Sequence, residues 1–121
     1  MSGRRERAEP TSAALEIEGA AQMPIGSVRL IEAAGVGAFA LYRLEDGYYA
    51  TDDLCTHGEA SLAEGDVDGD EIVCPFHLGR FDIRTGEATM APCVQALRCH
   101  AVTVSADGRV YLELPDGNAP P

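Results

Sequence analysis

The sequence has no apolar run that approaches the ~20 residues of a membrane-spanning helix, and it has few basic residues. Nine Lys and Arg stand against 20 Asp and Glu, so the formal net charge is −11. Nucleic acids and anionic lipid surfaces are bound through Lys and Arg. We therefore expect neither partner. The acidic surface either keeps the protein dissolved or meets a partner that has a basic docking patch.

Further absences exclude several functional classes. The sequence shows no helical period of convincing length, no internal repeat and no low-complexity tract. It also lacks a phosphate-binding loop and a nucleophile elbow. The pair Arg4 and Arg5 is followed by a stretch with Glu and Pro instead of an apolar segment, which argues against a twin-arginine export signal. We therefore expect a cytoplasmic protein.

Turn signals are frequent and predict many short strands. The chain of 121 residues contains 13 Gly and 7 Pro, and 45% of its residues are apolar, which suits one domain with its own core. Asp-Gly turns at 45–47, 68–69 and 106–108 predict hairpins. The candidate strands are residues 14–20, 27–31, 38–44, 48–51, 71–74, 80–83, 97–104 and 109–114.

These strands predict an all-β fold in which the two ends of the chain form an antiparallel β-sandwich base. Residues 52–93 form a loop-rich insertion, which is rich in Gly, Asp, Cys, His and Pro. We expect a single domain at 13–115, with flexible tails at 1–12 and 116–121.

Two short motifs in the insertion carry the chemistry. They are Cys55-Thr56-His57 and Cys74-Pro75-Phe76-His77, with sixteen residues between His57 and Cys74. Four cysteines in a cytoplasmic chain indicate metal or redox chemistry before disulfides. Thiolate and imidazole ligands suit zinc or an iron–sulfur cluster. Because each motif supplies one Cys and one His, the pairing favours a cluster with two metal atoms over a structural zinc finger.

The spacing C-x-H, sixteen residues and C-P-x-H resembles the signature of the Rieske family, and the resemblance extends over about residues 15–114. Residues 53–58 and 74–82 resemble more narrowly the ferredoxin components of bacterial aromatic-ring-hydroxylating dioxygenases. The same holds for Gly86-Glu87-Ala88 followed by Ala91-Pro92.

The resemblance implies a Rieske fold that holds one Rieske-type [2Fe–2S] cluster. Cys55 and Cys74 would bind the inner iron, and His57 and His77 would bind an outer iron near the surface. Pro92 would belong to a loop that covers the cluster. Backbone N–H groups of both loops would donate hydrogen bonds to the bridging sulfides, and Gly58 and Gly79 would allow that close approach.

Two differences from high-potential Rieske proteins indicate the branch of the family to which the resemblance points. High-potential Rieske proteins carry an extra Cys in each cluster loop, where this chain has Ala60 and Phe76, and they place Ser and Tyr donors after the second His. Here residues 78–81 supply neither Ser nor Tyr. With fewer donors to stabilise the reduced state, we expect a potential at the low end of the Rieske range, roughly −150 mV.

The expected function is that of an electron carrier without an enzymatic site of its own, because no second domain and no 2-His-1-carboxylate set is present. The resemblance implies a flavin-dependent ferredoxin reductase as electron donor and a terminal oxygenase of aromatic hydrocarbon catabolism as acceptor. Each would dock transiently around His57 and His77 on a monomer.

Two alternatives remain open. One is the small Rieske subunit of an assimilatory nitrite reductase, and the other is a zinc-stabilised binding module. Outside the motifs, Cys93 and Cys99 are interpreted as small buried residues. His100 is interpreted as a surface or core histidine, and the acidic residues at 66–70 as a solvated hairpin instead of a calcium loop.

Overall fold

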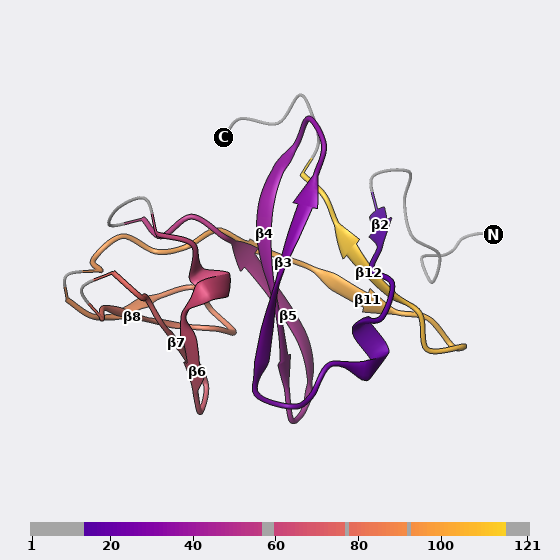
Figure 1. Cartoon of the computed structure of the whole chain (residues 1–121), viewed down its shortest axis with the longest axis horizontal. Helices are drawn as coiled ribbons and strands as arrows, with labels where there is room; N and C mark the ends of the chain where they lie inside the picture. The colour runs from indigo at the N-terminus through magenta and orange to yellow at the C-terminus, as the bar shows by residue number, and fades with distance from the viewer. Residues whose placement is uncertain (1–13, 57–59, 77, 92, 116–121) are drawn as a thin grey trace.

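The computed structural model describes residues 14–56, 60–76, 78–91 and 93–115 (Figure 1). The described chain forms three antiparallel sheets, which confirms the expected all-β class. The predicted tails at 1–12 and 116–121 lie outside the described residues. Helical structure within the described residues is limited to two three-residue 3₁₀ turns, η1 (Ala20–Gln22) and η2 (Leu62–Glu64), and neither is long enough to cross a membrane.

Two sheets built from the two ends of the chain form the base. The first has the order β10-β5-β4-β3 and the second the order β11-β12-β2. Their strands are β2 (Ala14–Glu16), β3 (Ser27–Ala33), β4 (Gly37–Leu44), β5 (Gly47–Asp52), β10 (Cys99–His100), β11 (Val102–Val104) and β12 (Val110–Glu113).

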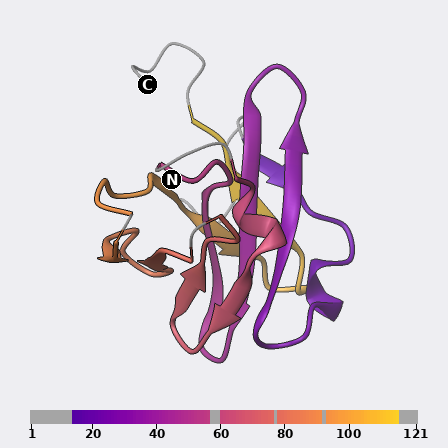
Figure 2. The same cartoon turned by 60° about the vertical axis from the view of Figure 1, so that its left-hand side comes forward.

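The insertion between β5 and β10 forms the third sheet, of order β6-β7-β8-β9. Its strands are β6 (Asp66–Asp68), β7 (Glu71–Val73), β8 (Arg80–Asp82) and β9 (Ala88–Met90). Figures 1 and 2 both show this sheet lying to one side of the base. The acidic stretch at 66–70 belongs to the β6–β7 hairpin, as expected.

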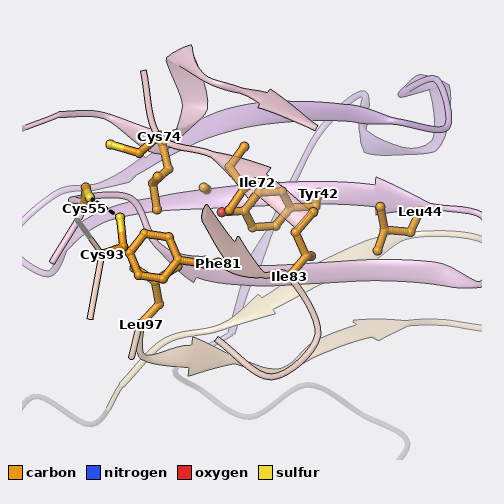
Figure 3. Packing of buried hydrophobic residues seen from close by; sticks show 11 residues of the cluster. Tyr42, Leu44, Cys55, Ile72, Cys74, Phe81, Ile83, Cys93 and Leu97 are labelled. Atoms are coloured by element: carbon orange, nitrogen blue, oxygen red, sulfur yellow. Dashed lines mark hydrogen bonds between the residues drawn. The ribbon is translucent and has the colours of Figure 1, made fainter. Parts of the chain in front are cut away.

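Strand β4 supplies side chains to two separate cores. Its residues alternate, so that Ala40, Tyr42 and Leu44 pack with the insertion, whereas Phe39 and Leu41 pack inside the base. Successive side chains of a strand point to opposite faces, which explains the division. The core beneath the insertion contains Tyr42, Leu62, Ile72, Phe81 and Ile83, and also three cysteines at one of its ends (Figure 3).

Several predicted strands have different bounds in the structure. The strand expected at 97–104 is divided, because β10 pairs with β5 whereas β11 pairs with β12 in the other sheet. The strand expected at 14–20 ends at Glu16, since Gly19 adopts a left-handed φ of 79° and a 3₁₀ turn follows. Strands β6 and β9 were not expected from the sequence.

Candidate metal centre

The first motif lies in a loop that begins where β5 ends. The carbonyl oxygen of Asp53 accepts a 2.8 Å hydrogen bond from the N–H of Leu62, and the Asp53 carboxylate accepts one of 2.9 Å from the N–H of Ala63. The N–H of Cys55 donates to the carbonyl oxygen of Ala60 at 3.0 Å. These bonds close the loop on itself and fix the Cys55 backbone.

The second motif connects β7 to β8 through a tight turn. The N–H of Cys74 donates a 2.7 Å hydrogen bond to the carbonyl oxygen of Gly79. Leu78 has a φ of 61°, which is unusual for a residue with a side chain and is typical of sharply turning functional loops. The turn therefore returns the chain beside Cys74.

His57, Gly58, His77 and Pro92 lie outside the described residues, so the predicted imidazole ligands and the covering proline stay predictions. Among the residues that are described, no set of three or more His, Cys, Asp or Glu side chains is arranged to hold a metal ion. Of the four predicted ligands, the structure describes the two cysteines, Cys55 and Cys74.

A third segment, at 93–97, lies against both loops, through Thr56 in the first and Gly79 in the second. The hydroxyl of Thr56 donates a 2.6 Å hydrogen bond to the carbonyl oxygen of Gln95. The N–H of Leu97 donates to the carbonyl oxygen of Gly86 at 2.8 Å. This segment brings the side chain of Cys93 into the space between the two motifs.

Three sulfur atoms consequently gather at one end of the core, as Figure 3 shows. Cys55, Cys74 and Cys93 are 1%, 0% and 3% exposed, and all three are free thiols. The Sγ atoms of Cys55 and Cys93 lie 3.8 Å apart. The sequence shows that Cys93 follows Pro92, but the contact of Cys93 with Cys55 carries no sequence signal.

Burial makes two of these thiols, Cys74 and Cys93, reluctant to ionise. Burial raises the pKa of the Cys74 thiol, although a hydrogen bond from the backbone of Phe76 lowers it in part. Burial also raises the pKa of Cys93 to about 12, and the neighbouring Cys55 adds to the rise. A buried thiolate becomes stable when a metal cation lies against it. Two buried soft donors at the bases of adjacent loops therefore fit an iron–sulfur group better than a hard cation.

Gly79 lies close to Cys93, whereas its expected approach to the bridging sulfides stays a prediction. A Cβ atom added to Gly79 would lie 2.3 Å from the Sγ atom of Cys93 and 3.1 Å from its backbone nitrogen. Such distances are far below van der Waals contact, so only glycine fits at this position while Cys93 keeps its place.

The remaining candidate residues, His100 and Cys99, lie on strand β10 of the base, outside the two motifs. His100 has a side chain that is 6% exposed, packs edge-on against Phe39 and lies 2.7 Å from the Asp52 carboxylate, so it is a core histidine, as expected. The expectation of burial is correct for Cys93 and wrong for Cys99, which is exposed. The reason is that successive side chains of β10 point to opposite faces, so that His100 faces the core and Cys99 faces outward.

Comparison with known proteins identifies the family. The family model for the Rieske [2Fe–2S] domain matches residues 14–103. The chain belongs to the Rieske [2Fe–2S] domain family. Its cofactor is one Rieske-type [2Fe–2S] cluster, and the two buried cysteines suit this cofactor.

Relatives of this Rieske chain include ferredoxin components of dioxygenase systems. It is 44% identical over 98 residues to ferredoxin CarAc of Metapseudomonas resinovorans, covering 81% of this chain and 91% of that protein. It is 42% identical over 93 residues to the ferredoxin component of the naphthalene 1,2-dioxygenase system of Pseudomonas aeruginosa, covering 77% and 88%.

Solved structures of similar fold include a ferredoxin of the same kind. A complex of reduced oxygenase and oxidised ferredoxin in carbazole 1,9a-dioxygenase contains a chain that matches with a TM-score of 0.80 and 42% identity, covering 85% of this chain and 94% of that one. A nitrite reductase small subunit from Mycobacterium tuberculosis, described as putative, matches with a TM-score of 0.74 at 15% identity, covering 86% and 96%. The second likeness shows the shared fold alone.

Proposed function

We propose that this protein carries single electrons from a flavin-dependent ferredoxin reductase to the terminal oxygenase of an aromatic-ring-hydroxylating dioxygenase system. The observation that carries the proposal is the likeness, over nearly the whole ferredoxin chain, to a ferredoxin in complex with its oxygenase. The bound cluster would supply a one-electron redox centre. The chain's own residues hold the centre, shield it and present it to partners.

The proposed ligands are Cys55 and Cys74 for the inner iron and His57 and His77 for the outer iron. Two observations support the cysteines: each is almost fully buried, and each follows a strand whose loop is closed by backbone hydrogen bonds. The N–H of Phe76 also donates to the Cys74 sulfur, as suits a thiolate ligand. The histidines are proposed from their place in the motifs.

A docking surface around the two motifs is proposed from the distribution of exposed apolar side chains. Five of them lie within four positions of Cys55, Cys74 or Cys93, and we name them the apolar rim: Leu54, Phe76, Leu78, Met90 and Val94. Their exposed fractions reach 84% at Val94. Exposed apolar residues that gather beside a functional group are typical of protein-binding sites.

Charge would act before the apolar rim makes contact. The net charge of −11 favours partners with a basic docking surface, and long-range attraction raises their encounter rate. Screening shortens this attraction to about 8 Å at physiological ionic strength. Electron transfer to the oxygenase is therefore expected to slow as salt is added.

The proposal also includes a potential near the low end of the Rieske range, roughly −150 mV, because no Ser or Tyr hydroxyl follows His77 in residues 78–81. It further includes a cytoplasmic location and a monomeric state. Gel filtration tests the state, and redox titration tests the potential.

The decisive experiment uses anaerobically purified protein. We expect about two iron and two sulfide per chain, visible absorbance and a Rieske-type EPR signal on reduction. Replacing Cys55 or Cys74 with Ser, or His57 or His77 with Ala, should abolish that signal, whereas the matched control Cys99→Ser should keep it. A colourless protein with one zinc per chain would contradict the proposal and favour a zinc-stabilised module.

Turnover experiments test the role itself. Purified reductase, this protein and a dioxygenase should oxidise an aromatic substrate together, and omission of this protein should stop product formation. Stable co-purification with a nitrite reductase large subunit, with no support of dioxygenase turnover, would overturn the role and leave the cluster assignment intact.

A further inference from the structure

Cys93 is a third buried sulfur beside the two proposed cysteine ligands, and its position is fixed. Its backbone N–H donates a 3.2 Å hydrogen bond to the carbonyl oxygen of Met90. Its side chain lies over Gly79, where no Cβ atom would fit. With an exposed fraction of 3%, the thiol has little access to water. The thiol proton therefore has to find its acceptor inside the protein.

The nearest identified acceptor is the Cys55 sulfur. The two Sγ atoms lie 3.8 Å apart, within hydrogen-bond distance for sulfur, and geometry alone leaves either atom as the donor. The proposed function removes this ambiguity, because a cysteine that binds iron is a thiolate and has no proton to give. Cys93 then has to be the donor and Cys55 the acceptor.

We propose that the Cys93 thiol donates an S–H···S hydrogen bond to the iron ligand Cys55 and thereby raises the reduction potential of the cluster. This inference rests on the proposed function, because it requires Cys55 to be a ligand. Reduction adds one electron and increases the negative charge on the ligand sulfurs, so a donor stabilises the reduced state more than the oxidised state. No bond to Cys93 forms or breaks, and its proton stays on its own sulfur.

The surroundings of Cys93 distinguish a hydrogen-bond donor from a side chain that only fills space in the core. An apolar side chain of similar volume would pack against Gly79 equally well, but it would leave the Cys55 sulfur without this donor. The thiol is only a weak donor, but no water competes for its acceptor at this depth. Cys93 is therefore a positioning residue that acts through Cys55, and it is not a member of the ligand set.

Its test is the midpoint potential of the loaded protein and of three variants. Cys93→Val and Cys93→Ala remove the donor, and Cys93→Ser replaces it with a hydroxyl. Cys99→Ala is the matched control, because it removes the exposed thiol. In the Val and Ala variants we expect the equilibrium constant for reduction to fall about threefold to tenfold, which is ~28–59 mV at 59 mV per tenfold for one electron. The Ser variant should stay closer to wild type, and the control should match wild type.

A spectroscopic readout separates hydrogen bonding from packing. Iron–sulfur stretching bands in resonance Raman spectra should shift when wild type is moved from H₂O to D₂O, and the Cys55-related part of that shift should vanish in Cys93→Val. Equal potentials in wild type and both apolar variants, with intact clusters, would overturn the role of Cys93 and leave the ligand assignment standing. Loss of the cluster in the Val and Ser variants alike would also overturn it. Wild type without iron would instead refute the proposed function.

Discussion

His100 and Asp52 form a side-chain pair in which Nε2 lies 2.7 Å from Oδ1, and the pair joins two strands of the base three residues before Cys55. His100 stands on the edge strand β10, and Asp52 is the last residue of β5. The pair therefore fixes the point at which the chain leaves the base and enters the first loop of the metal centre.

Removing this pair should weaken the fold. His100→Ala deletes the contact with Asp52 and the edge-on packing against Phe39, whose ring centroid is 4.8 Å away. We expect the free energy of unfolding to fall by about 2 kcal/mol, measured anaerobically by denaturant titration. Arg98→Ala is the control, because Arg98 is half-exposed and its Nε lies 3.6 Å from Asp52. An equal loss in both variants would show that the His100–Asp52 pair contributes no more than an exposed ion pair.

Arg84 holds the insertion to the base and should matter for thermal stability. Its guanidinium contacts Asp46 at 2.9 Å and Asp70 at 2.7 Å, and its carbon Cζ lies 5.2 Å from the centre of the Tyr49 ring. Arg84→Met should lower Tm by ~3–5 °C at pH 7, and Arg84→Lys by less. Arg109→Met is the control, because its ion pairs are more exposed and lie within the base.

The same contact predicts a pH dependence. The Arg84 guanidinium holds the pKa of Asp46 below its ordinary value of 3.8. A lowered carboxyl pKa stabilises the folded state above that ordinary value, and the contribution is lost as pH falls through the folded-state pKa. The Tm difference between wild type and Arg84→Met should therefore be full at pH 6–7 and shrink below about pH 4. A difference that stays constant across this range would contradict the ion-pair explanation.

Gly79→Ala should force Cys93 away from the metal centre. The new Cβ atom would lie 2.3 Å from the Cys93 sulfur, so we expect a loss of about 1–3 kcal/mol in unfolding free energy and a lower cluster content. The double variant Gly79→Ala/Cys93→Ala removes that sulfur and should recover part of the loss, measured by denaturant titration and iron analysis. If the double variant recovers nothing, the new Cβ atom clashes with the backbone of Cys93 and not with its sulfur.

The apolar rim predicts a defect in electron transfer without a defect in folding. Val94 is 84% exposed, so Val94→Ser should change stability by less than about 0.5 kcal/mol and leave the midpoint potential unaltered. Reduction of a terminal oxygenase, followed by stopped-flow absorbance, should slow by about fivefold, the equivalent of ~1 kcal/mol of docking energy. Val104→Ser changes the same residue type on β11 of the base and should react like wild type.

The sequence predicted the hairpins more reliably than the strands around them. Tight hairpin turns require left-handed dihedrals, which Asp-Gly pairs accept, and Gly69 and Gly108 adopt φ values of 62° and 88° in two of those turns. Strands β6 and β9 are only three residues long, which is too short to show a period. The division of 97–104 into β10 and β11 depends on partners far away in the chain, which no local pattern reports.

The surroundings of the candidate site were less predictable than its motifs. Fixed spacing predicted Cys55 and Cys74 as ligands, and the structure shows both side chains buried, while their role as ligands stays a prediction. The contact between Cys93 and Cys55 joins residues 38 positions apart through a third segment, and the sequence shows only that both are cysteines. Contacts of this kind depend on tertiary packing and are found only in the folded chain.

The alternation of β4 has a consequence for how the protein can lose its iron. An insertion that contacted the base only through its two ends would be able to unfold locally while the base stayed folded. Here Tyr42 and Leu41 are neighbours on one strand, and each anchors a different core. A shift of that strand by one residue would exchange the two faces and ruin both cores together. Retention of the cofactor and integrity of the whole chain are thus one cooperative property, and cluster bleaching should report global unfolding.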